Sequence, residues 1–348
     1  MLNKNEASIY DILQKGTLLA TEDFIISIDM GGTKMLAAAV NPQKQIFARM
    51  KRATNVVSGK SDYADDIARL VEDMISEHGL NPENLKAVCL GIPGSVMIEE
   101  GIIGIAPNLG LKDYPVRDEL KARLPYPVLI ENDVNLAALG IRDWELPRHH
   151  RNILVVFLGT GIGGGLVLNG QIYRGSTSIA GEIGHITYST SGPVCGCGKK
   201  GCFEAVASRT AIVRHITADI KAGKKSVLKA KVDEGKMIKS KAIASALREK
   251  DKVTVNAVTS ATKIAGKVLS DINNLLNLDL IVLGGGLIEA AGDFILPILR
   301  KSFEKYSLKD CLDAVELHVT ELGDDAALYG GLSLVEEFTD YRWDRSEG

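Results

Sequence analysis

The sequence has 348 residues, 45% of them hydrophobic, and a formal charge of −3. This length can bury two cores, so we expect two domains. The slightly acidic balance argues against a basic nucleic-acid binder and favours an enzyme that acts on small molecules. No apolar run reaches the roughly 18 residues of a membrane helix, and the N-terminus lacks the order of a signal peptide, so we expect a cytoplasmic protein.

The first half of the chain opens with an extension, residues 1–23, in which apolar residues recur at helical spacing. Dense β patterns then predict a meander of three strands, and buried apolar runs predict two more. The predicted strands lie at 24–29, 35–40, 45–54, 85–92 and 128–130. Helical spacing predicts helices at 62–78 and 134–139.

The second half begins at Asn152 and starts again with β patterns before it turns helical. Its predicted strands lie at 153–158, 166–168 and 278–283, and its predicted helices at 204–222, 239–249 and 252–276, after Gly286, and from Asp324 onward. Residues 221–252 are rich in lysine, but acidic and apolar residues are interleaved and aromatic residues are absent. This segment is therefore interpreted as a solvated helical hairpin rather than a nucleic-acid surface.

Two glycine-rich turns follow apolar strands, one in each half. Asp29–Lys34 contains Gly-Gly-Thr-Lys, and Gly159–Gly165 begins with Gly-Thr-Gly. Glycines let backbone amides approach an anion without a Cβ in the way, and each turn adds a threonine hydroxyl. Both turns lead into a strand rather than a helix, so neither is a P-loop or a Rossmann fingerprint. Either turn alone could be structural, but the pair predicts a phosphate chain held by two similar domains.

Two further features extend this predicted nucleotide site. Asp29 closes the first strand with a carboxylate that suits hydrated Mg²⁺ beside phosphates. Gly284–Gly286 ends a third strand and would let a nucleotide base and ribose lie against the backbone.

Asp133 directly follows the strand at 128–130, at the expected seam between the halves. A carboxylate there can accept the proton of a sugar hydroxyl as that oxygen attacks the γ-phosphorus of ATP. Aspartate is also a common helix N-cap, and the local pattern is equally compatible with that structural role.

One histidine and three cysteines fall within 18 residues: His185, Cys195, Cys197 and Cys202. This set matches a closed tetrahedral zinc site, which leaves no open position for catalysis. Free cysteines and a catalytic zinc are the less favoured interpretations. Such a site would pin a loop and place Glu182 and Glu204, whose carboxylates suit vicinal sugar hydroxyls unless they are surface residues.

Taken in order, these motifs resemble the ROK family, which contains sugar kinases and sugar-responsive repressors on the actin-like, hexokinase-type ATPase fold. The resemblance covers about residues 24–340 and includes Glu131–Asn135, Glu182–His185 and Cys195–Glu204 beside the glycine motifs. It implies an α/β protein with two similar, ribonuclease H-like domains around a central cleft. The domains are expected at 24–134 plus 325–348, which form the small domain, and at 135–324, which form the large domain with the zinc loop.

The resemblance also implies residue roles. Asp133 would be the catalytic base, and the hexose contacts would be Asn108, Asn132, Asp133, Glu182, His185 and Glu204. Structural Zn²⁺ would be held by His185, Cys195, Cys197 and Cys202. ATP and Mg²⁺ would be bound by Asp29, Gly31, Gly32, Thr33, Lys34, Thr160, Gly161, Gly163, Gly164, Gly284, Gly285 and Gly286.

Within the family, the sequence favours a kinase over a repressor. A DNA-binding module needs on the order of 60 residues to bury its own core, whereas 23 residues precede the first predicted strand. We therefore expect no DNA partner, a hexose and ATP as ligands, and a homodimer, as is common in the family. Glucose is the favoured substrate; N-acetylglucosamine, N-acetylmannosamine or fructose phosphorylation and a sugar-sensing regulator without a complete DNA-binding domain are the alternatives.

Overall fold

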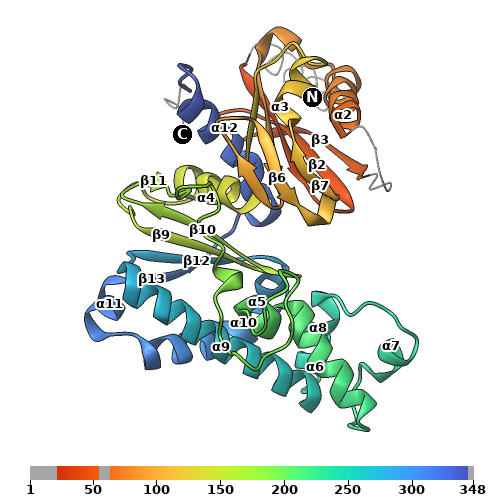
Figure 1. The fold of residues 1–348 in the computed structure, drawn as a ribbon, viewed down its shortest axis with the longest axis vertical. Helices are drawn as coiled ribbons and strands as arrows, with labels where there is room; N and C mark the ends of the chain where they lie inside the picture. The colour runs from red at the N-terminus through yellow and green to blue at the C-terminus, as the bar shows by residue number, and fades with distance from the viewer. Residues whose placement is uncertain (1–21, 55–62, 344–348) are drawn as a thin grey trace, which may run out of the picture. The chain divides into compact units, whose positions relative to one another are not determined.

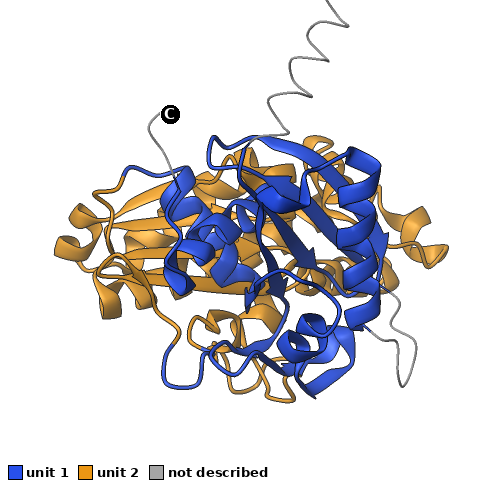
Figure 2. Ribbon diagram, turned by 90° about the horizontal axis from the view of Figure 1, so that it is seen from above, with its two compact units in different colours: residues 1–147, 175–179, 324–348 blue, residues 148–174, 180–323 orange. Residues whose placement is uncertain are grey.

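The computed structural model describes residues 22–54 and 63–343. The chain divides into two compact units, coloured separately in Figure 2. Unit 1 comprises residues 1–147, 175–179 and 324–348, and unit 2 comprises residues 148–174 and 180–323. The helix expected in residues 1–23 lies almost entirely outside the described residues.

Unit 1 is built on a five-stranded sheet with the order β3-β2-β1-β4-β8. Its strands are β1 (Phe24–Met30), β2 (Lys34–Val40), β3 (Ile46–Ala53), β4 (Leu85–Ile92) and β8 (Val128–Asn132). Its helices are α2 (Tyr63–His78), α3 (Val116–Lys121), α4 (Asp133–Trp144) and α12 (Ala326–Phe338). The predicted meander is present, because β1 pairs antiparallel with β2 and β2 with β3.

Both faces of β1 are covered, which explains why five of its seven residues are apolar. Alternate residues of a strand point to opposite faces. Phe24, Ile26 and Ile28 belong to a core shared with α2. On the opposite face Ile25 and Ser27 meet α12, and Figure 1 shows this helix beside the strands although some 300 residues separate them.

The helix α4 belongs to unit 1, although we expected the domain boundary at residue 134. It packs closely against α12, because a side chain at Gly140 or at Gly330 would overlap with the backbone of the other helix. Because of this packing, residues 133–147 belong to unit 1.

The sequence pattern predicts no elements between residues 93 and 127. The structure has a separate three-stranded antiparallel sheet there, with the order β5-β6-β7, followed by α3. Its strands are β5 (Ser95–Met97), β6 (Ile102–Ala106) and β7 (Leu111–Tyr114), and short 3-10 turns lie at Pro82–Asn84, Pro107–Leu109 and Gly323–Asp325. These strands are too short to give a clear alternating pattern.

Unit 2 contains a second five-stranded sheet, with the order β11-β10-β9-β12-β13. Its strands are β9 (Ile153–Leu158), β10 (Ile162–Leu168), β11 (Gln171–Ile172), β12 (Leu280–Gly284) and β13 (Glu316–Val319). In unit 1, β1 pairs antiparallel with β2 and parallel with β4. In unit 2, β9 pairs antiparallel with β10 and parallel with β12. The two sheets thus share one strand order, as expected for two similar domains.

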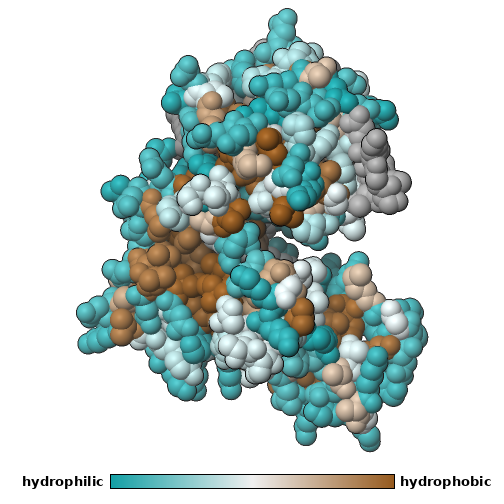
Figure 3. Space-filling model, viewed as in Figure 1, coloured by the Kyte–Doolittle hydropathy of each residue, from teal (hydrophilic) through white to brown (hydrophobic). Residues whose placement is uncertain are grey.

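The helices of unit 2 pack with its sheet into one apolar core. They are α5 (Phe203–Ala207), α6 (Arg209–Lys221), α7 (Lys229–Asp233), α8 (Ser240–Arg248), α9 (Lys252–Leu276), α10 (Gly286–Tyr306) and α11 (Lys309–Ala314), with a 3-10 turn at Ile183–His185. In the face seen in Figure 3, apolar surface gathers over β9 and β13, whereas the helices are mostly hydrophilic. Among the described residues, no helix has the length and apolar character needed to cross a bilayer.

The helix predicted at 204–222 is in fact two helices, α5 and α6. Ser208 lies between them in an extended conformation and caps α6, where its hydroxyl accepts a hydrogen bond from the backbone N–H of Ala211 at 3.2 Å. Apolar spacing continues across this break, so the periodicity alone did not reveal it.

Candidate active-site residues and the metal cluster

The predicted residues of unit 1 gather at one edge of its sheet. Strands β1, β4 and β8 are parallel, and Asp29 is in register with Gly91, which in turn is in register with Glu131. The carboxyl ends of parallel strands meet at one edge, where α/β proteins commonly bind ligands. This register places Asp29 and the start of α4 on the same edge.

The first glycine turn is closed by its own backbone. The N–H of Gly31 donates to the carbonyl of Lys34 at 2.9 Å, and the side chains of Thr33 and Lys34 are exposed. A Cβ at Gly32 would lie 2.9 Å from the carbonyl oxygen of Asn108, so the turn and Asn108 are in contact. The structure thus brings a predicted hexose residue to a predicted phosphate turn within unit 1.

Asp29 has a perturbed acidity. Burial raises the pKa of Asp29 to about 6, and the carboxylate of Asp324 adds to this effect, while Lys34 opposes it. A second carboxylate nearby disfavours the charged form, and a bound cation would relieve that repulsion. The donor set therefore fits a hydrated Mg²⁺ ion.

Asn132, and not Asp133, caps helix α4. Its side-chain oxygen accepts from the N–H groups of Val134 and Asn135 at 3.0 and 3.1 Å. Its amide nitrogen donates to the carbonyl of Gly94 at 3.1 Å. The backbone therefore engages both ends of the Asn132 side chain, which gives it a positioning role in addition to the hexose contact that we predicted for it.

Asp133 occupies the first turn of α4, where one carboxylate oxygen accepts from the N–H of Val134 at 2.9 Å. The structural alternative considered for it, the N-cap, is thus taken by its neighbour. The N-terminus of a helix favours a carboxylate in its ionised form. Ionised carboxylate is the form that a general base requires.

Glu131 supports this turn from inside the protein, a role that the sequence motif did not predict. It is completely buried, and its Oε1 accepts from the N–H of Asn132 at 2.9 Å and from the amide of Asn135 at 3.2 Å. A buried carboxylate satisfied by such bonds holds the segment around Asp133 in one conformation.

The second glycine turn, in unit 2, is a tight turn with an arginine side chain beside it. The N–H of Gly159 donates to the carbonyl of Gly161 at 3.0 Å. Arg209, at the start of α6, donates from its guanidinium to the hydroxyl of Thr160 and to the hydroxyl of Ser240 at 3.3 Å. Neither Arg209 nor Ser240 was predicted, because Arg209 seemed to lie in the middle of a single helix over 204–222.

The outer glycines of this motif also shape the packing of the next segment. Gly163 and Gly164, which we predicted to bind phosphate, both lie within β10, directly after the turn. A Cβ at Gly164 would be 2.7 Å from the carbonyl oxygen of Gly181, and one at Gly184 would overlap with that of Ile162. These glycines allow the segment 181–185, which carries Glu182 and His185, to pack backbone to backbone against β10.

Glu204 connects the glycine turn with the cysteine cluster. Its Oε2 accepts from the backbone N–H of Ile162 at 2.9 Å, and its Oε1 lies 3.8 Å from the sulfur of Cys195. Its carboxylate therefore orders the turn at Gly161, in addition to the hexose contact that we predicted for it.

The four predicted zinc ligands come together. The ligand atoms of His185, Cys195, Cys197 and Cys202 all lie within 4.8 Å of one another. The sulfurs of Cys197 and Cys202 are 3.6 Å apart, and so are the Cys195 sulfur and Nδ1 of His185. Tetrahedral Zn–S bonds of about 2.3 Å place two sulfurs about 3.8 Å apart, so the donor set fits zinc.

The surroundings of the cluster fit a metal as well. Nε2 of His185 faces Glu182 at 3.6 Å, the arrangement of a ligating histidine held by a carboxylate. Burial raises the pKa of Cys195 to about 12 and also raises the pKa of Cys202, whereas the backbone N–H of Lys199 lowers the pKa of Cys197. Without a cation this cluster would resist forming three thiolates.

Gly284–Gly286 links the end of β12 to the start of α10. Gly285 has φ of +89°, and a Cβ there would lie 2.9 Å from the carbonyl oxygen of Leu158. A Cβ at Gly286 would lie 3.8 Å from the hydroxyl of Ser240. The N-terminus of α10 is thus close to the Ser240 and Arg209 hydrogen bonds, within unit 2.

Comparisons with known proteins identify the family. Residues 25–338 match the ROK family. A glucokinase from Halalkalibacterium halodurans is 34% identical over 318 residues, which cover 91% of this chain and 96% of that protein. A putative xylose repressor from Caldicellulosiruptor sp. is 28% identical over 89% of this chain and 77% of its own length.

A solved structure shows the same fold. The ROK family glucokinase from Streptomyces griseus, in complex with glucose and AMPPNP, superposes with a TM-score of 0.76 and 29% identity. The match covers 90% of this chain and 99% of that one. This protein is therefore a member of the ROK family, and it has the actin-like, hexokinase-type ATPase fold.

Proposed function

We propose that the protein transfers the γ-phosphoryl group of ATP to a hexose, with glucose as the first choice. The observation that carries the proposal is Asp133 in the first turn of α4, on the same sheet edge as Asp29, with N-capping left to Asn132. The glucokinase relative and the glucose-bound structural neighbour support the substrate class.

In this reaction Asp133 would accept the proton of the attacking sugar hydroxyl. A carboxylate at a helix N-terminus is favoured in its ionised form, and Glu131 and Asn132 hold the backbone around Asp133 in place. Phosphoryl transfer otherwise depends on positioning and charge neutralisation. Asn108, Glu182 and His185 would bind hexose hydroxyls, and Glu204 would do so while it holds the turn at Gly161.

The nucleotide phosphates would be held by Thr33 and Lys34 in unit 1 and by Thr160 and Gly161 in unit 2. Arg209 would add a positive charge beside Thr160, and the base and ribose would lie against Gly284–Gly286. Mg²⁺, when bound near Asp29, would neutralise charge on the phosphates. The zinc would be structural, since four protein ligands leave no open position.

Two alternatives follow from the relatives. An N-acetylhexosamine or fructose would use the same base and phosphate groups, with a different pocket near the sugar C2. A sugar-sensing regulator is favoured by the similarity to a xylose repressor. It would bind sugar tightly without turnover.

The test is Mg-ATP-dependent ADP release, measured with glucose, N-acetylglucosamine, N-acetylmannosamine, fructose, mannose and allose, together with sugar-binding titrations. The highest kcat/KM is expected for glucose. Turnover with another hexose would replace the substrate, and tight binding without turnover would favour the regulator.

Asp133→Asn separates chemistry from binding. The amide keeps the hydrogen bonds but not the basicity, so kcat should fall by about 10²-fold to 10⁴-fold while the hexose Kd changes little. The exposed Asp113→Asn is the matched control. Near-normal turnover in Asp133→Asn would remove Asp133 from the role of base.

A further inference from the structure

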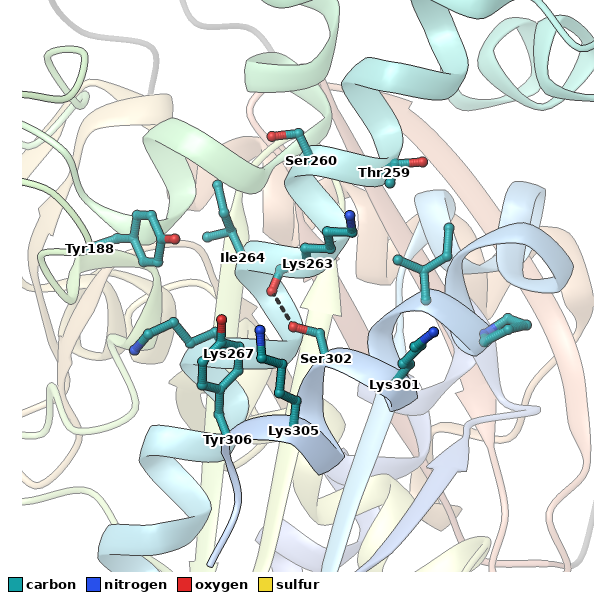
Figure 4. A pocket seen from close by; sticks show the side chains of 12 residues that line it. Tyr188, Thr259, Ser260, Lys263, Ile264, Lys267, Lys301, Ser302, Lys305 and Tyr306 are labelled. Carbon is teal, nitrogen blue, oxygen red and sulfur yellow. Dashed lines mark hydrogen bonds between the residues drawn. The ribbon is translucent and has the colours of Figure 1, made fainter.

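A pocket of about 710 Å³ lies in unit 2 between α9, α10 and the loop that carries Tyr188. Figure 4 shows its walls: α9 contributes Lys263 and Lys267, and α10 contributes Lys301, Lys305 and Tyr306. None of the twelve lining residues is acidic. Sequence analysis did not identify this site, and none of these residues takes part in the proposed phosphoryl transfer.

The four lysines form two pairs on facing helices. Lys263 and Lys267 are four residues apart, as are Lys301 and Lys305, so each pair lies on one face of its helix with Cβ atoms about 6 Å apart. The helices are in close contact here, because the hydroxyl of Ser302 donates to the carbonyl of Lys263 at 2.7 Å. Both pairs therefore line one pocket.

Little negative charge balances these lysines. Lys267 pairs with Asp271 at 2.7 Å. For Lys263, Lys301 and Lys305, no carboxylate of residues 22–54 or 63–343 lies within ion-pair distance. The ammonium groups of Lys267 and Lys305 both lie near the ring centroid of Tyr306, at 5.5 and 5.0 Å. Figure 4 shows the two ammonium groups on either side of this ring. A polyanion bound here would supply negative charge to a pocket whose lining has none of its own.

The size and lining of the pocket indicate what kind of anion fits. Small-molecule sites are commonly about 300–1,000 Å³ in volume, so this pocket suits an organic molecule rather than a single small ion. Lysine binds phosphate as a flexible point charge. Lys263, Lys301 and Lys305 come from two helices and can contact two phosphate groups at once, and the tyrosine rings can cover the body of the ligand.

We infer that this pocket binds a small molecule that carries two or more phosphate groups. Its binding is separate from the proposed transfer reaction and can be measured without turnover. Inorganic and organic sources share this chemistry, so both are tested as probes.

The experiment is calorimetric titration of the full chain with fructose 1,6-bisphosphate and with inorganic tripolyphosphate. We expect at least one probe to bind, with an affinity that falls as salt is raised. Lys263→Gln/Lys301→Gln should weaken binding at least tenfold. Lys263→Arg/Lys301→Arg should retain most of it, because the charge is kept.

The control Lys225→Gln/Lys252→Gln removes the same charge from exposed positions of unit 2 outside the pocket. It should bind the probe as the wild type does. If neither probe binds, or if both glutamine variants lose affinity equally, the pocket is not the site and the inference is overturned. Sugar-dependent ADP release without added probe should be unchanged in Lys263→Gln/Lys301→Gln, which also shows that this variant is folded.

Discussion

Asn132 and Asp133 are adjacent residues with separate tasks, and the separation follows from where each lies relative to the first turn of α4. The cap residue precedes the helix, so its side chain turns back to the N–H groups of the next residues. The following residue is already helical, and one of its carboxylate oxygens accepts from the N–H of Val134 at 2.9 Å. Such a division of roles is decided by a single residue of register.

Asp29→Asn should change how stability depends on pH. The folded pKa of Asp29, about 6, exceeds its ordinary value of 3.8, so the stability that this group contributes is complete below about pH 4 and is lost as pH rises through 6. An asparagine has no such proton. At pH 8 without Mg²⁺ the variant should be more stable than the wild type by about 3 kcal/mol, and the difference should shrink towards pH 5.

Urea unfolding between pH 5 and pH 8 measures this difference. The exposed Asp113→Asn should show no comparable trend. A difference between Asp29→Asn and the wild type that does not vary with pH would contradict the expected acidity of Asp29.

Arg209→Gln should weaken nucleotide binding. The change removes the positive charge beside Thr160 but leaves the segments that carry Asp133 and Glu182 untouched. We expect the KM for ATP to rise about tenfold, with less than a twofold change for the hexose. Arg209→Lys should show a smaller rise, and Arg248→Gln, an exposed position at the end of α8, should show none. An unchanged KM for ATP in Arg209→Gln would limit Arg209 to a structural role.

At the scale of elements, the glycines of β10 and of the segment 181–185 explain how Glu182 and His185 are held. Backbones can approach this closely only where no Cβ intervenes. Glu204 then adds a hydrogen bond from the neighbouring α5 to the turn that begins β10. The predicted hexose residues of unit 2 therefore depend on one strand for their placement.

Gly184→Ala tests this dependence, because its Cβ would overlap with the carbonyl oxygen of Ile162 and push the segment away from β10. Hexose affinity should fall at least tenfold, measured by titration calorimetry. Gly196→Ala is the matched control, since a Cβ there meets no atom within 4 Å. Equal affinities in the two variants would show that the close approach does not position Glu182.

At the scale of the whole molecule, the two units share one strand order but carry different candidate functional residues. Unit 1 supplies the Asp29 and Asp133 edge, and unit 2 supplies the cluster of His185 with three cysteines and the Arg209 turn. The cluster also links three separate stretches of unit 2, namely the Glu182–His185 segment, the cysteine loop and, through Glu204, the glycine turn. Removal of the metal should therefore affect more than the loop itself.

Cys197→Ser should lose zinc, measured by elemental analysis, and with it thermal stability and hexose affinity. Treatment of the wild type with a zinc chelator should have the same effects. Cys311→Ser is the control, because Cys311 lies outside the cluster. Hexose binding that survives complete loss of zinc would show that the cluster does not support the sugar residues.

By itself, the sequence determined the features that depend on local spacing. Alternation and apolar runs predicted most strands and long helices, and the Cys-x-Cys-x4-Cys spacing with His185 predicted the cluster, because its ligands lie close in the chain. Its motifs also indicated the family. Three features were not predicted. The strands within 95–114 are too short to show a pattern, and the apolar spacing runs on across the break at Ser208. The place of α4 in unit 1 depends on its packing against α12, which local spacing does not show.

Only the tertiary structure decided which distant residues meet. The parallel register aligns Asp29 with Gly91 and Glu131, a buried hydrogen bond fixes the Asp133 turn, and Arg209 reaches Thr160 from 49 residues away. The lysine pocket likewise exists only because α9 and α10 pack together. Local periodicity reports which face of an element is buried, but it carries no information about which other element covers that face.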